Sequence, residues 1–122
     1  MKSAMHDQKP GTPPVFDAAE ALSIVDGDRD LFQELVHLFR DSYAAELQAI
    51  QEAIGRRDSE ALQRASHHLK GTLGTLAAGP ARNTALRLEH LGNSADFDPA
   101  PAVYLEMEQQ LRALDQALSS WR

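Results

Sequence analysis

The chain has 122 residues, of which 43% are apolar and 25% are charged, and its formal net charge is −6. This length suits one domain with a single core, and the acidic balance argues against nucleic acid and anionic membranes as main partners. Cysteine is absent, which excludes disulfides and thiolate metal sites. No apolar run approaches the roughly 18 residues of a membrane span, and the N-terminus lacks the apolar core of a signal peptide. We therefore expect a soluble, cytoplasmic protein.

Two regions differ in their pattern. Residues 1–14 are polar and rich in proline, which predicts a flexible arm or linker. From residue 15 to residue 122 apolar side chains recur at helical spacing, and no stretch shows the sustained alternation of a strand. We therefore predict one helical domain over residues 15–122.

The first two predicted helices both begin at an aspartate that can act as an N-cap. The first begins after Asp17 and ends near Gly27, whereas the second begins at Asp28 and ends at Gly55. The length of the second helix allows a kink near Asp41–Ser42. Its apolar stripe comprises Leu31, Phe32, Leu35, Leu38, Phe39, Tyr43, Leu47, Ile50 and Ile54.

The third and fourth predicted helices follow after short connections. The third begins at Asp58 or Ser59 and runs to about Ala78. The fourth covers the stretch GPARNTALRLEHLG, with Pro80 in its first turn and Gly92 just past its end.

A fifth helix is predicted to begin with Asp98 as its N-cap. Its apolar seam comprises Val103, Met107, Leu111, Leu114, Leu118 and Trp121. Short connections make neighbouring helices antiparallel. The predicted fold is therefore all-α, an antiparallel four-helix bundle with a short extra helix at its N-terminus.

The third helix contains two interior glycines, and each costs about 1 kcal/mol relative to alanine. At about 100° per residue, Gly71 and Gly74 lie on the same face as His67 and Lys70, opposite the apolar stripe. A glycine on an exposed face removes a side chain, so another surface can approach closely. The predicted docking surface around His67 comprises Gln63, Arg64, Gly71, Gly74 and Ala78.

This face has the elements needed for phosphoryl transfer. A solvent-exposed imidazole is mostly neutral at cytoplasmic pH, so a ring nitrogen is available as a nucleophile. Phosphoryl transfer needs little beyond an in-line nucleophile and nearby positive charge, which Lys70 can supply one turn after His67. An ordinary surface histidine and lysine would show the same pattern, so these two residues alone leave both interpretations open.

The stretch SHHLKGTLGTLAA, residues 66–78, resembles the signature of histidine-containing phosphotransfer (HPt) domains, roughly A-H-x-L-K-G-x-x-x-x-L-G-A. Alignment on the Lys-Gly pair puts the family's phosphorylated histidine at His67 and not at His68. The stretches DLFQELVHLFRDS and LRLEHLG extend the resemblance to about residues 16–120. The chain departs from the pattern at Ala77, where the family often has glycine, and in the stretch from Thr72 to Thr75. We expect these departures to affect partner choice.

The resemblance implies a fold and a function. Members of the family are four-helix bundles, often preceded by a short helix. They have no kinase activity of their own, and they accept a phosphoryl group from an aspartate of one receiver domain and pass it to another. His67 would be the acceptor and Lys70 its electrostatic support. No cofactor is implied for the chain, and Mg²⁺ is expected only in the partner receiver domain.

Three alternatives remain for the wider role of the chain. It is a free-standing carrier or the cytoplasmic end of a membrane-bound hybrid sensor kinase. It could instead be the phosphotransfer domain of a chemotaxis-type kinase. A third alternative is a helical bundle that binds a partner without carrying phosphate, which the joint presence of His67 and Lys70 disfavours.

Other chemical motifs are weaker. Glu34 and His37 form a single E-x-x-H, whereas di-iron bundles use two, so no metal site is expected. The stretch DGDRD lacks the glycine and glutamate of a calcium loop at the required positions. His90, near the end of the fourth helix, is placed to stabilise the helix dipole. No nucleotide-binding signature occurs, so the phosphoryl group must come from a partner.

Overall fold

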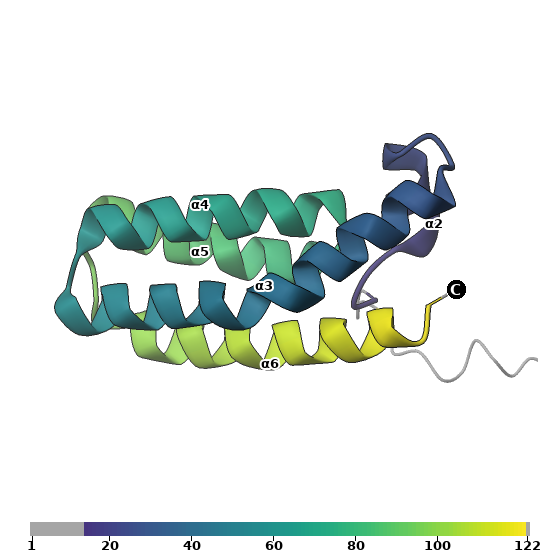
Figure 1. Cartoon of the computed structure of the whole chain (residues 1–122). Helices are drawn as coiled ribbons and strands as arrows, with labels where there is room; N and C mark the ends of the chain where they lie inside the picture. Colours follow the sequence, from purple (N-terminus) through teal and green to yellow (C-terminus); the bar gives the residue numbers. More distant parts are fainter. Residues whose placement is uncertain (1–13, 122) are drawn as a thin grey trace, which may run out of the picture.

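The structure is a computed structural model that describes residues 14–121 (Figure 1). It contains a short helix α2 (Ala18–Ile24) and four long helices, α3 (Arg29–Arg56), α4 (Ser59–Thr75), α5 (Gly79–Ser94) and α6 (Ala100–Ser119). Helix α4 packs against α3 and α5, and α6 packs against the same two helices. The predicted antiparallel four-helix bundle with a short extra N-terminal helix is confirmed. The predicted arm, residues 1–14, lies outside the described residues except for Pro14.

Three helices begin at the aspartates that the sequence predicts. Asp17, Asp28 and Asp58 each accept a hydrogen bond of 3.0 Å from the backbone N–H three residues further on. The start of α6 differs from its prediction. Its N-cap is Pro99, which makes no side-chain capping bond, so the expected cap at Asp98 is wrong.

Helix α3 ends at Arg56, one residue beyond Gly55, and Figure 1 shows that it bends along its length without a break. Its apolar stripe divides in the first half: Phe32 and Phe39 are buried, whereas Leu31 and Leu38 are exposed. The first half of α3 therefore presents apolar side chains both to the core and to solvent.

Helix α4 ends at Thr75, three residues before the predicted end at Ala78. Ala77 adopts a left-handed backbone with φ 55°. Its N–H bonds the Gly74 carbonyl at 3.1 Å, and the Ala78 N–H bonds the Leu73 carbonyl at 3.0 Å. This is a Schellman motif, whose left-handed residue is usually glycine because glycine has no Cβ to clash. The turn explains why the family pattern often has glycine at this position.

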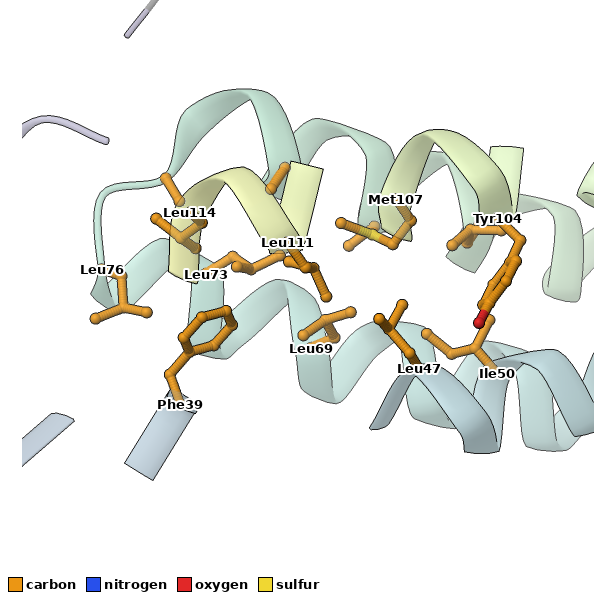
Figure 2. Packing of buried hydrophobic residues seen from close by; sticks show 14 of the residues in the cluster. Phe39, Leu47, Ile50, Leu69, Leu73, Leu76, Tyr104, Met107, Leu111 and Leu114 are labelled. Atoms are coloured by element: carbon orange, nitrogen blue, oxygen red, sulfur yellow. The ribbon is translucent and has the colours of Figure 1, made fainter. Parts of the chain in front are cut away.

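The core runs along the bundle between the four long helices (Figure 2). The side chains that fill it include Phe39, Leu47 and Ile50 from α3, Leu69 and Leu73 from α4, Leu88 from α5, and Met107, Leu111 and Leu114 from α6. Because Leu69 and Leu73 direct the apolar side of α4 toward the core, the opposite side of that helix faces solvent. No helix within residues 14–121 is long and apolar enough to span a bilayer.

Candidate functional site

His67 lies in the middle of α4, on the side turned away from the core. Its neighbours Ser66 and Leu69 are fully buried, whereas 65% of the His67 side chain is exposed. The predicted orientation of His67 toward solvent is therefore confirmed. His68 is also exposed, but it lines the side of α4 that faces α3.

A single carboxylate from α5 joins His67 to Lys70. Glu89 Oε2 lies 2.8 Å from His67 Nδ1, and Glu89 Oε1 lies 2.8 Å from Lys70 Nζ. Only 10% of the Glu89 side chain and 21% of the Lys70 side chain are exposed. The structure thus brings together the predicted acceptor and the predicted cation, with Glu89 between them.

Glu89 is not among the residues that the sequence predicts for the site. The residue lies in LRLEHLG, a stretch that carries part of the family resemblance, and α4 and α5 were expected to be antiparallel neighbours. Helix pairing alone does not say which turn of α5 faces His67. That register depends on contacts between residues distant in the sequence.

Gly92 shows how the register is fixed. This glycine is buried inside α5, so its predicted place past the helix end is wrong. A Cβ on Gly92 would stand 2.7 Å from Gln63 N and 2.9 Å from Gln63 Cα, so the two backbones approach more closely than any side chain allows. Gln63 lies one turn before His67, and Gly92 lies nearly one turn after Glu89. The close approach of the two helices therefore lies beside the His67–Glu89 pair. It lets the Glu89 side chain reach His67.

The surroundings of Glu89 keep it ionised. The Lys70 ammonium makes the largest contribution, and with the contact to His67 it lowers the pKa of Glu89 below its usual value despite the opposing effect of burial. An ionised carboxylate can only accept hydrogen bonds, so His67 Nδ1 donates its N–H to Glu89. In the neutral ring the lone pair is then on Nε2, the nitrogen that does not contact Glu89.

The residues predicted for the docking surface differ in their exposure. A Cβ on Gly71 would meet nothing within 4 Å, so this position is open. The space beside Gly74 is partly taken by the Arg82 side chain. Arg64 is exposed and Gln63 is half-buried. Ala78 is only 1% exposed and does not belong to this surface, because α4 ends before it and the chain turns toward α5.

A groove between α3 and α4 borders the other side of the site. Its volume is about 250 Å³, and Leu38 at its edge is 65% exposed, the highest value among the large apolar side chains of the described residues. The groove is lined by Leu35, Leu38, Phe39, Ser42, Glu46, His68, Thr72, Thr75 and Leu76. An apolar surface thus lies next to His67 and His68 on α4.

The candidate metal ligands do not gather in this part of the chain. Within residues 14–121, no three His, Cys, Asp or Glu side chains come close enough together to hold a metal ion. Glu34 and His37 are both exposed on α3.

A known protein family matches most of the helical domain. The family model described as "Hpt domain" matches residues 34–119, which is more than half of the chain. The chain belongs to the Hpt domain family. This Hpt domain is a phosphorelay intermediate, a carrier of phosphoryl groups. A search of curated proteins finds no match.

Two solved structures resemble this Hpt domain in fold. Histidine-containing phosphotransfer protein B (HptB) from Pseudomonas aeruginosa PAO1 has a TM-score of 0.80 and 21% identity, over 91% of this chain and 100% of that one. The HPT domain of the Hpt sensor hybrid histidine kinase from Shewanella has a TM-score of 0.76 and 17% identity, over 86% of this chain and 91% of that one.

Proposed function

We propose that Nε2 of His67 accepts a phosphoryl group from an aspartyl phosphate of one receiver domain and passes it to an aspartate of another. The observation that carries this proposal is the 2.8 Å contact between His67 Nδ1 and Glu89 Oε2. It supplies a reason for Nε2 to hold the lone pair, and His67 is the exposed histidine that aligns with the family's acceptor.

The chemical step needs no proton transfer. The Nε2 lone pair forms the N–P bond as the bond between phosphorus and the aspartyl oxygen breaks, and the electron pair leaves with that oxygen. Because Nδ1 keeps its proton, the phosphorylated ring is cationic. The Glu89 carboxylate stabilises this charge, as the buried aspartate does for the imidazolium of a Ser-His-Asp triad. Attack by the second receiver's aspartate reverses the same bond changes.

Lys70 has two roles in this proposal. Its ion pair with Glu89 keeps the carboxylate ionised, which holds the ring in the reactive tautomer. The side chain remains partly exposed one turn from His67, where it supports the negative charge of the phosphoryl group. The first role follows from the ion pair, and the second from the position of Lys70 on the helix.

The receiver domain is placed against the open surface beside His67. Gly71 removes a side chain that would hold the receiver away, and the apolar groove between α3 and α4 offers area to bury. Leu31, Leu35 and Leu38 follow one another at helical spacing along the same side of α3. Together these features fit a protein surface with an apolar patch next to its reacting aspartate.

The wider role is proposed on the same basis. Mg²⁺ would act only in the receiver, so chelation should stop transfer from a receiver without preventing chemical phosphorylation of His67. A cytoplasmic location fits the partners. The mechanism is the same for a free-standing carrier and for a segment of a hybrid sensor kinase. Of the two structural neighbours, one is named as a phosphotransfer protein and the other as a domain of a hybrid histidine kinase.

A pair of matched variants tests the acceptor. The His67→Gln protein should take up no acid-labile phosphate from a phosphorylated receiver, whereas His68→Gln should still take up label at His67, even if its place in the groove changes the rate. Glutamine at position 67 keeps a donor for Glu89 and His68 is exposed, so far-UV circular dichroism should show both variants folded. Label that persists in His67→Gln and disappears in His68→Gln would contradict the proposal.

A further inference from the structure

Arg82 lies across the exposed side of α4. A Cβ built on Gly74 would be 3.4 Å from Arg82 Nε and 3.6 Å from Arg82 Cδ, so the arginine side chain rests over the glycine. Arg82 itself is exposed, and within the described part of the chain no hydrogen bond or ion pair involves it. By contrast, Arg87 on the same helix pairs with Glu106 at 2.9 Å.

The position of Arg82 repeats that of Glu89. Gly74 lies seven residues after His67 on α4, and Arg82 lies seven residues before Glu89 on the antiparallel α5. Seven residues are about two turns, or about 10 Å along a helix, and return to nearly the same face. Arg82 therefore bears the same relation to Gly74 as Glu89 does to His67. Glu89 orients the nucleophile His67, whereas Arg82 has no side chain to contact at Gly74. Its guanidinium therefore lies on the same face of the α4–α5 pair as His67.

This guanidinium is suited to recognise a carboxylate. It is planar and always charged, it presents paired N–H donors, and it lies over a helix position without a side chain. Gly74, over which the Arg82 side chain rests, lies about two turns from His67, so the guanidinium lies away from the transferring phosphoryl group. The group it recognises must therefore belong to the surface of the docked partner.

We propose that Arg82 is a docking residue that pairs with a carboxylate on the receiver domain, about two helical turns from the reacting aspartate. The pairing fixes the register of the receiver along α4 and α5 and favours receivers with an acidic side chain at that place. This inference rests on the proposed function. Arg82 acts on docking and takes no part in the bond changes at His67.

The experiment compares Arg82→Gln and Arg82→Glu with Arg87→Gln as a matched control from the same helix. A receiver domain that phosphorylates the parent protein is loaded with acetyl phosphate, and the transfer rate is measured against receiver concentration. Arg82→Gln should raise the half-saturating concentration about tenfold, and Arg82→Glu should raise it further, with the maximal rate unchanged. The increase should shrink in high salt. Arg87→Gln should match the parent.

Labelling of each protein by phosphoramidate, a small donor that needs no docking, separates this inference from the proposed function. All Arg82 variants should be labelled at the parent rate. Half-saturating concentrations equal to that of Arg87→Gln would overturn the docking role, and so would a lower maximal rate with slower phosphoramidate labelling. If the parent protein itself took up no label at His67, the proposed function would fail instead. Circular dichroism confirms that each variant is folded.

Discussion

Lys70 Nζ lies 2.8 Å from Glu89 Oε1, while the other oxygen of the same carboxylate contacts His67. The lysine is therefore an ion-pair partner as well as a cation beside the nucleophile. This arrangement makes Glu89 the residue through which the two predicted site residues act on each other.

Glu89→Gln should slow phosphotransfer by about 10- to 100-fold at saturating receiver. The amide keeps the size of the side chain but removes the charge, and a charge-assisted contact contributes about 1.5–3 kcal/mol. Single-turnover transfer from a phosphorylated receiver measures the effect. His90→Gln, at the exposed neighbouring position, is the control and should transfer at the parent rate. A parent-like rate in Glu89→Gln would show that the carboxylate does not stabilise the phosphorylated ring.

Glu89 should also make stability depend on acid pH. Because its pKa is lowered in the folded protein, its contribution is fully present above its ordinary value near 4.5. That contribution is lost as pH falls through the lower folded value. The parent should therefore lose more stability than Glu89→Gln as pH falls below about 4.5. Urea unfolding followed by the fluorescence of Trp121, which packs edge-on against Phe32, measures the difference. If the free energy of unfolding changed with pH by the same amount in both proteins, this would contradict the lowered pKa of Glu89.

Two helical glycines should respond oppositely to alanine. Gly71→Ala should stabilise the protein by up to about 1 kcal/mol, because alanine favours helix and the new methyl meets nothing. Gly92→Ala should destabilise it by about 1–3 kcal/mol, because the methyl would collide with the Gln63 backbone. Urea unfolding of both variants decides the sign. Stabilisation by Gly92→Ala would mean that α4 and α5 separate without cost.

Ala77→Gly should stabilise the fold by about 1 kcal/mol. Ala77 has a left-handed backbone at the end of α4, where a Cβ is unfavourable and glycine is the usual residue. Ala78→Gly is the matched control, because Ala78 has φ −95° and is buried. That variant should lose stability, since glycine has more backbone entropy to lose on folding and leaves a small void. Thermal melts in one buffer compare the two variants.

The sequence predicted the parts of the molecule that depend on local periodicity. Apolar spacing predicted the helices and the exposed position of His67, and aspartate caps predicted three helix starts. The prediction that Ala78 lies on the exposed face was wrong because it assumed helical geometry of 100° per residue beyond Thr75, where α4 ends. That end depends on the left-handed turn at Ala77, a conformation for which an alanine gives no sequence signal.

The partner of His67 could not be predicted in the same way. Glu89 reaches the histidine because α5 approaches α4 at Gly92 and Gln63, and this contact joins residues far apart in the chain. The sequence shows a glycine near the end of a helix, which by itself indicates a helix stop. Only the packing shows that this glycine sets the distance between two helices.

The most direct test of the account is to locate the phosphoryl group on the phosphorylated protein by ¹⁵N and ³¹P NMR. The account predicts a single phosphohistidine at His67, with phosphorus coupled to Nε2 and with Nδ1 still protonated against Glu89. Phosphorus coupled to Nδ1 of His67, or a phosphoryl group on His68, would contradict it.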